Sequence, residues 1–162
     1  FSVHYDMDDG ELRKRGLVVV ENTDRGQFRR ATVADRFTDF LEEEVCRLLF
    51  EGASRNGHLI DFLEGVLEPA LVTLLEKHHY TGPVGLDAFL YQDRDGAVRW
   101  KPVVEINPRY TMGRVALELA RFTPSHAQTS LTIAPVGQGP PGALCLTPCL
   151  AETRWAAFLD GK

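Results

Sequence analysis

Two strand-like segments separated by a short turn constrain this fold more than any other feature of the chain. Residues 84–91 and 98–107 are rich in apolar and aromatic side chains, and residues 92–97 between them carry the Asp and Gly typical of a turn. Strands joined by so short a connection pair antiparallel. The sequence therefore predicts a β-hairpin over residues 84–107 and, with it, an antiparallel sheet.

The second strand of this hairpin ends in polar side chains at alternate positions, Glu105, Asn107 and Arg109. Side chains two residues apart on a strand share one face, so we expect Glu105 and Asn107 to point the same way, together with Arg109 if the strand continues. Carboxylate and amide oxygens bind hard cations, and a guanidinium meets phosphate charge. This is the set of groups that a magnesium–nucleotide site needs.

The register of the hairpin decides which residue of the first strand joins this set. A turn centred near residues 94–95 places Asp87 opposite Val103 and makes it a diagonal neighbour of Glu105, about 7 Å away on the same face. Lys101 has the same parity, whereas a shift of one residue would move Asp87 to the other face. Two neighbouring carboxylates predict either cations between them or an exposed face with a Lys101–Glu105 pair, and both readings stay open here.

The remaining segments predict more strands, then helices, then strands again. The expected strands form an N-terminal meander and two C-terminal segments, at residues 2–5, 17–21, 27–33, 129–134 and 143–146. The expected helices cover residues 40–50, 59–79 and 111–121, with a last helical turn or two within 152–159.

Local signals set the expected limits of these elements. Thr38 or Asp39 is the expected cap of the first helix, and Pro69 should kink or split the second. Residues 54–57 and Pro124 should end two of the helices, while residues 6–10 and 22–26 should form turns, with Gly26 in the left-handed region. This order of elements predicts an α+β fold, an antiparallel sheet flanked by helices.

The composition is that of a globular domain. The 162 residues, 44% hydrophobic and 25% charged, suit a single domain over residues 1–162. A net charge of −5 argues against nucleic acid as a partner, and the chain has no apolar run of about 18 residues that would insert into a membrane. The odd number of cysteines argues against a complete disulfide framework, so we expect a cytoplasmic protein.

Three clusters of reactive residues favour ordinary structural roles. Cys46, Cys145 and Cys149 are expected to be small buried apolar residues. The acidic run 42–44 is expected on a solvated helix face, and the His pair 78–79 at the C-terminal end of a helix, where its charge suits the dipole. Neighbouring residues on a helix point in different directions, so neither run favours a metal site.

The motifs of the hairpin resemble a known family. Gly85-Leu-Asp-Ala-Phe89, Glu105-Ile-Asn-Pro-Arg109 and Thr111-Met-Gly113 are similar to the C-terminal subdomain of the ATP-grasp fold. The resemblance is specific over residues 82–121, looser over 1–81, where Gly26-Gln-Phe-Arg29 resembles the strands before this site, and has no support over 124–162, which we expect to be an extension.

The resemblance implies a role for each site residue. Asp87, Glu105 and Asn107 would hold one or two Mg²⁺ or Mn²⁺ ions between the phosphates of ATP, with Glu105 bridging. Arg109 would contact the transferred phosphoryl group as the catalytic residue, and Lys101 and Arg109 would bind the nucleotide.

The implied reaction is the ATP-dependent joining of a small carboxylate to an amine or thiol through an acyl phosphate. Family members clamp ATP between two subdomains, and the chain lacks the N-terminal one with its phosphate loop. We therefore expect residues 1–162 to be a fragment of a longer protein, inactive alone, with the missing subdomain as its partner. The alternatives are a non-catalytic ATP-grasp-like module for binding or assembly, and an unrelated α+β domain.

Overall fold

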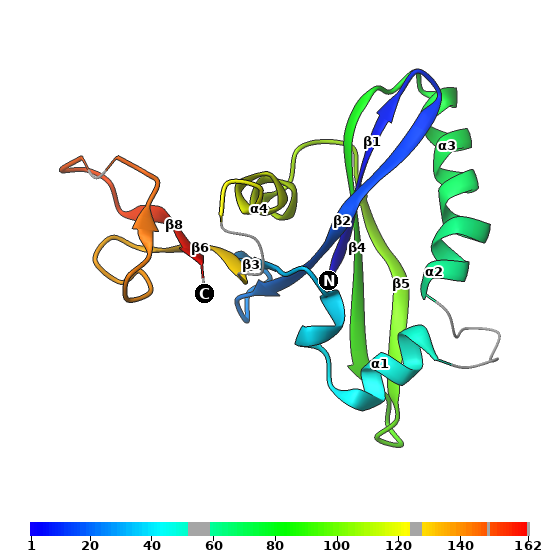
Figure 1. Cartoon of the computed structure of the whole chain (residues 1–162), viewed down its shortest axis with the longest axis horizontal. Coiled ribbons are helices and arrows are strands. Elements are labelled where there is room, and N and C mark those ends of the chain that lie inside the picture. Colours follow the sequence, from blue (N-terminus) through cyan, green and yellow to red (C-terminus); the bar gives the residue numbers. More distant parts are fainter. Residues whose placement is uncertain (52–58, 124–127, 149, 162) are drawn as a thin grey trace.

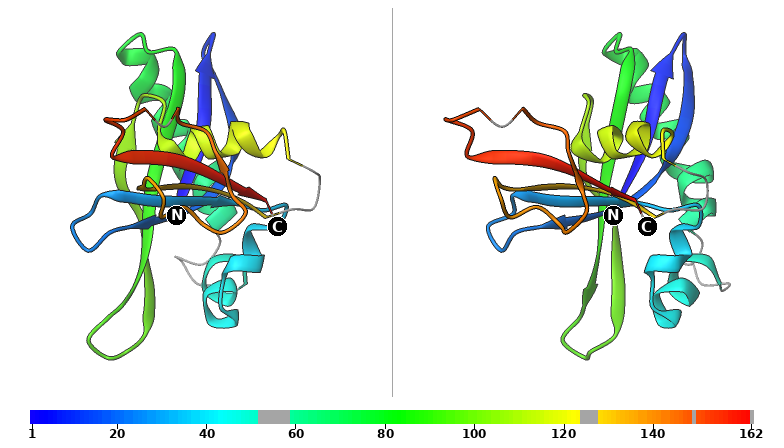
Figure 2. Two further views of the ribbon diagram at one scale, coloured as in Figure 1. Left: turned by 90° about the vertical axis from the view of Figure 1, so that its left-hand side faces the viewer. Right: turned by 60° about the vertical axis from the view of Figure 1, so that its left-hand side comes forward.

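The computed structural model describes residues 1–51, 59–123, 128–148 and 150–161. Within these residues the strands form one antiparallel sheet in the order β5-β4-β1-β2-β3-β6-β8-β7 (Figures 1 and 2). Its strands are β1 (Ser2–Asp8), β2 (Glu11–Asn22), β3 (Phe28–Val33), β4 (Gly82–Gln92), β5 (Val98–Asn107), β6 (Thr129–Pro135), β7 (Leu144–Cys145) and β8 (Trp155–Gly161). The predicted α+β class, an antiparallel sheet with flanking helices, is confirmed.

The helices follow two of the three expected helical regions closely. Their bounds are η1 (Phe37–Phe40), α1 (Glu43–Phe50), α2 (Leu59–Phe62), η2 (Leu63–Leu67), α3 (Glu68–Lys77) and α4 (Met112–Ala120). None of the helices in the described parts of the chain is both long and apolar enough to cross a membrane.

Strand β1 lies inside the sheet and is buried on both faces. Val3, Tyr5 and Met7 point into the larger core, which the helices α1, α2 and α3 cover. The alternate residues of β1 point to the opposite face, toward α4. Figure 1 shows α3 and α4 on the two sides of the strands β1, β2, β4 and β5.

The helical region from Leu59 to Lys77 continues through its proline instead of splitting. Residues 63–67 form a π-helical turn in which the backbone N–H of Glu68 donates to the carbonyl of Leu63. Pro69 follows in the first turn of α3, where its missing N–H costs little. The wider turn before the proline therefore absorbs the expected kink.

Helix α4 packs against the second half of the sheet. Its residue Ala116 shares a smaller core with Val18, Ala31 and Leu131 of β2, β3 and β6. Arg114 of the same helix is only 4% exposed, and two of its guanidinium nitrogens donate hydrogen bonds to the carboxylate of Asp6 on β1, at 2.5 and 3.0 Å. The helix is thus fixed to both halves of the sheet.

The predicted start of the first helix is wrong. Thr38 and Asp39 lie in the separate 3-10 turn η1, and α1 begins only at Glu43, after extended residues and without a side-chain cap. Leu41, which lies within the predicted helix, packs against the core from this extended segment instead. The end predicted for α1 at residues 54–57, like the stop at Pro124, lies outside the described residues.

The predicted C-terminal helical turn is also wrong, because residues 155–161 form strand β8. Ala156 and Phe158 are buried and Trp155 is exposed, which is the period-two pattern of a strand. The whole length of β8 pairs with β6. Pairing with a neighbouring strand outweighs the helix propensity of Ala and Leu in this short segment.

Smaller expectations have mixed outcomes. The turn predicted over residues 6–10 starts later, because β1 runs to Asp8, whereas the hairpin turn with Gly26 at φ +75° is confirmed. The acidic run 42–44 is exposed as expected, and the His pair 78–79 directly follows the last residue of α3, at the C-terminal end of the helix as expected. Cys145 is exposed and Cys46 only partly buried, so the buried reading is wrong for Cys145, while Cys149 lies outside the described residues.

We predict that Asp6→Ala destabilises the protein by about 3 kcal/mol, because it leaves the buried Arg114 guanidinium with one acidic partner fewer. Asp8→Ala is the matched control on the same strand, since Asp8 is exposed and only 3.5 Å from the exposed Arg13, and should cost less than about 1 kcal/mol. Urea unfolding measures both. Equal losses for the two variants would contradict the anchoring role of Asp6.

Acid should weaken this anchor in a defined direction. Hydrogen bonds from Arg114 and then Arg15 hold the pKa of Asp6 below its ordinary value of 3.8. A carboxylate with a lowered folded-state pKa contributes its full stability above the ordinary value and loses it as pH falls through the lowered pKa. The stability difference between wild type and Asp6→Ala should therefore be constant down to about pH 4 and shrink below it.

Candidate functional site

The β4–β5 hairpin brings the two predicted carboxylates directly opposite each other. Asp87 on β4 pairs with Glu105 on β5, and Gly85 pairs with Asn107. The expected partner of Asp87 was Val103, so the predicted register is wrong at this end of the hairpin. The shared face of Asp87, Glu105 and Asn107 is nevertheless as expected.

A bulge around Pro102 explains both the error and the agreement. From Asp87 to Phe89 on β4 the paired residues on β5 run from Glu105 to Lys101, so β5 carries two extra residues. Pro102 has no N–H to donate to the ladder, which favours an irregularity at this point. Because side chains alternate with a period of two, a shift of two residues keeps every side chain on its face.

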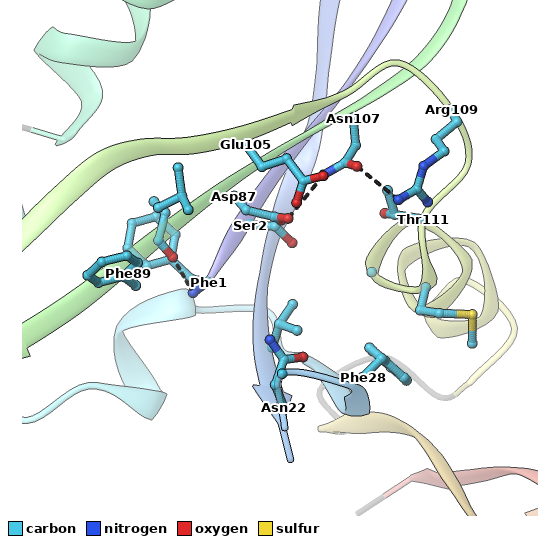
Figure 3. Close-up of a pocket in the computed structure, with 16 residues that line it drawn as sticks. Phe1, Ser2, Asn22, Phe28, Asp87, Phe89, Glu105, Asn107, Arg109 and Thr111 are labelled. Carbon is cyan, nitrogen blue, oxygen red and sulfur yellow. Dashed lines mark hydrogen bonds between the residues drawn. The ribbon is translucent and has the colours of Figure 1, made fainter. Parts of the chain in front are cut away.

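A cleft of about 420 Å³ opens over these side chains (Figure 3). Its polar lining residues are Ser2, Asn22, Asp87, Glu105, Asn107, Arg109 and Thr111. Its apolar lining residues are Phe1, Val20, Phe28, Ala88, Phe89, Val104 and Met112, together with Gly26 and Gly113. A cleft with an apolar surface and a few convergent polar groups is typical of a small-molecule site.

Three of the predicted site residues form one hydrogen-bonded chain. The amide nitrogen Nδ2 of Asn107 donates to Oδ2 of Asp87 at 3.1 Å, and a guanidinium nitrogen of Arg109 donates to Oδ1 of Asn107 at 2.9 Å (Figure 3). Asn107, the middle residue of this hydrogen-bonded series, is buried, with 5% of its surface exposed. Arg109 and Glu105, in contrast, are exposed and line the cleft. These hydrogen bonds fix the orientation of the Asp87 carboxylate.

The environment of Asp87 disfavours the charged form of its carboxyl group. Burial, and then the nearby charge of Glu105, raises the pKa of Asp87 above its ordinary value of 3.8. The described residues contain no side-chain ion pair that includes Asp87 or Glu105. The site therefore holds negative charge that the protein itself does not neutralise with a salt bridge.

The N-terminal end of α4 forms part of the wall. Thr111 caps the helix, with its side chain accepting from the backbone N–H of Arg114 at 3.3 Å, and Thr111, Met112 and Gly113 line the cleft. The first N–H groups of a helix lack partners within it and, with the helix dipole, favour an anion. Arg109, two residues before the cap, adds a guanidinium on the same side.

Lys101 is the predicted site residue that the structure leaves apart from the others. It is exposed, does not line the cleft, and its ammonium lies 6.0 Å from the ring centre of Phe89. Lys101 pairs with Phe89, as the expected register implies, and the bulge lies between Lys101 and Glu105. The alternative of a Lys101–Glu105 pair is not present among the ion pairs of the described residues.

Sequence reasoning missed several residues of the cleft. Ser2 of β1 lies across from Asp87, while Asn22 and Phe28 come from the β2–β3 hairpin. Ser2 had a usable signal, because Ser2 and His4 are polar residues at alternate positions of one strand and therefore share a face. Asn22 and Phe28 enter through the fold of the sheet, which the local pattern does not reveal.

The donor set fits a hard cation better than a soft one. In the part of the chain that the structure describes, no three or more His, Cys, Asp and Glu side chains gather as a metal-binding group. The predicted set instead has two carboxylates and one amide oxygen. Magnesium is held in proteins by one or two carboxylates completed by water and substrate phosphates, so this set is sufficient for it.

We predict that Asp87→Asn stabilises the protein when no metal is present, because it removes a half-buried charge and keeps an acceptor for Asn107. A carboxylate with a raised folded-state pKa costs stability above that pKa and costs nothing once both states are protonated. The higher melting temperature of the variant should thus appear at pH 7 and vanish below about pH 4. Asp95→Asn, in the exposed turn of the same hairpin, is the control and should show no such difference.

Comparison with known proteins does not identify a family for this chain. No protein-family model matches the chain, and no sequence among the curated proteins matches it.

Proposed function

We propose that the chain is the C-terminal part of an ATP-dependent carboxylate–amine or carboxylate–thiol ligase of the ATP-grasp type. In this proposal the cleft holds the magnesium and phosphate side of the ATP site. The observation that carries it is the direct apposition of Asp87 and Glu105, joined through Asn107 to Arg109 in one cleft. The resemblance of the motifs in residues 82–121 suggests the family, and the geometry supports the proposed roles of Asp87, Glu105, Asn107 and Arg109 but not that of Lys101.

The cation is assigned to Asp87, Glu105 and Asn107. The two carboxylates form no side-chain salt bridge with any residue that the structure describes. Burial and the charge of Glu105 raise the pKa of Asp87, so a divalent cation would relieve the repulsion between the two carboxylates. The third proposed ligand atom is Oδ1 of Asn107, which accepts a hydrogen bond from Arg109 in this structure. Mg²⁺ or Mn²⁺ there would neutralise phosphate charge on ATP.

Arg109 and the first turn of α4 are assigned to the phosphates. The substrate carboxylate would attack the γ-phosphorus, forming an acyl phosphate and releasing ADP, and the amine or thiol would then displace inorganic phosphate from the acyl carbon. Both steps develop charge on phosphoryl oxygens, which a guanidinium and free helix N–H groups stabilise. This chemistry requires no nucleophilic side chain from the protein.

One observation favours the alternative of a non-catalytic binding or assembly module. Both polar atoms of the Asn107 amide already have partners within the protein, Asp87 and Arg109. The cluster can therefore keep its shape without a ligand. The two proposals differ in turnover, so kinetics on the full-length protein separate them.

We predict that Glu105→Gln in the full-length protein lowers ATP turnover by about 100-fold or more, because it removes the bridging carboxylate from the cation. Circular dichroism should show an unchanged fold, since Glu105 is exposed. Glu44→Gln on the exposed face of α1 is the matched control and should turn over ATP normally. Normal turnover by Glu105→Gln would place the active site elsewhere, and a full-length protein that binds Mn²⁺·ATP without turning it over would support the binding module.

We also predict that residues 1–162 alone catalyse no ligation and bind ATP weakly if at all, because the opposite wall of the proposed ATP site is not part of them. Isothermal titration with Mg²⁺·ATP and an assay for ADP release measure the two properties. ATP-dependent ligation by this chain by itself would refute the assignment of the missing half.

A further inference from the structure

A second polar pair lies in the floor of the cleft, next to the predicted cation ligands. Ser2 of β1 pairs with Asp87 of β4, which in turn pairs with Glu105 of β5. The three residues therefore form one row across neighbouring strands, with side chains on the same face. His4 occupies the next row, opposite Gly85.

Ser2 and His4 are joined to each other and almost completely buried. The Oγ atom of Ser2 lies 2.9 Å from Nε2 of His4, and each residue is 1% exposed. Ser2 nevertheless lines the cleft, beside Asp87 (Figure 3). A buried hydroxyl at the wall of a cleft is poised to serve a ligand there.

Two glycines leave room for the imidazole and little space around it. A Cβ atom on Gly113 of α4 would lie 2.5 Å from Nε2 of His4 and 3.1 Å from Oγ of Ser2. A Cβ atom on Gly85 of β4 would lie 3.3 Å from Cε1 of His4. The pair is therefore enclosed between the sheet and the helix, which fixes the ring and the hydroxyl that it contacts.

His4 adds no charge to the site at neutral pH. Burial, and then the neighbouring Arg114, lowers the pKa of His4 to about 4. A neutral imidazole has one donor and one acceptor nitrogen, so it can orient a hydroxyl without opposing a cation. Arg114 itself is held by Asp6 and Glu118, which face it from β1 and from its own helix.

The hydroxyl of Ser2 retains hydrogen-bonding capacity toward the cleft. A serine hydroxyl has one donor and two acceptor positions, and the contact with His4 uses one of them. Magnesium usually keeps several of its waters, which need partners in the protein. Ser2, in the row of Asp87 and Glu105, is placed to supply one.

We propose that Ser2 and His4 are positioning residues of the cation site. The Ser2 hydroxyl binds a water of the divalent cation that Asp87 and Glu105 hold, and His4 fixes that hydroxyl. This inference rests on the proposed function, because it needs a cation between the two carboxylates. It assigns to β1 a share in a site that the sequence placed on the β4–β5 hairpin alone.

The test measures Mn²⁺ affinity of the full-length protein with a non-hydrolysable ATP analogue, by the relaxation of water protons. Ser2→Ala should weaken Mn²⁺ binding about 10-fold, as is typical when a partner of a metal shell is removed. Ser130→Ala, a buried serine of β6 bonded to Thr32 at 3.1 Å, is the matched control and should leave the affinity unchanged. Thermal melting is followed separately, so that loss of stability is distinguished from loss of affinity.

The variants of His4 separate positioning from packing. His4→Gln keeps a hydrogen-bonding group for Ser2 and should retain most of the affinity, whereas His4→Leu should weaken it as Ser2→Ala does. Equal affinities for Ser2→Ala and wild type, with Glu105→Gln weakened, would overturn this inference and leave the proposed function standing. Unchanged affinity in Glu105→Gln would overturn both.

Discussion

The ion pair between Asp6 and Arg114 determines where the walls of the cleft lie. It joins an inner strand of the sheet to α4 through two nitrogens of a guanidinium that is almost fully buried. Apolar packing of Ala116 on the second half of the sheet is non-directional and would tolerate a rotated helix. The bidentate contact is directional, so it sets which end of α4 lies over β1 and brings Gly113 against His4.

Strand β1 has one apolar face, which packs in the core, and one polar face, which forms part of the floor of the cleft. Val3, Tyr5 and Met7 bury apolar surface against the helices, while the alternate residues are polar and lie under α4. A strand buried on both faces is usually apolar on both, because buried polar groups need partners. Here the partners are present for Asp6 in Arg114 and for Ser2 in His4. Stability is thus supplied by one face and the polar floor of the cleft by the other.

The sequence correctly predicted the two strands of the hairpin and the shared face of its polar residues. It did not predict the register next to Asp87, because the bulge around Pro102 adds two residues to β5 and leaves the alternation of side chains unchanged. An odd shift would have separated Asp87 from Glu105, so the agreement on the shared face depended on the size of the bulge. Strand β8 was missed for a related reason, since its partner β6 is distant in the chain.

The contribution of β1 could not be predicted from local pattern either. Gly113, which encloses His4, lies more than a hundred residues away along the chain, and nothing in the alternation of residues 2–5 indicates which helix will cover them. Such contacts depend on the path of the whole chain, whereas the hairpin depends on a turn of six residues, 92–97.

The charges near the cleft argue for a ligand that is itself a cation. The ammonium of Lys101 stacks on Phe89, away from the carboxylates, and Arg109 reaches Asn107. The imidazole of His4 is uncharged at neutral pH, because burial and Arg114 lower its pKa to about 4. Among the described residues neither Asp87 nor Glu105 forms a side-chain ion pair, and burial and the charge of Glu105 raise the pKa of Asp87 despite the opposing charges of Arg109 and the N-terminal amino group. The apposition of the two carboxylates therefore costs stability in the absence of a ligand. In the proposed function, a divalent cation would remove that cost and, with Arg109 and the start of α4 beside it, would leave room for an anion such as a phosphate.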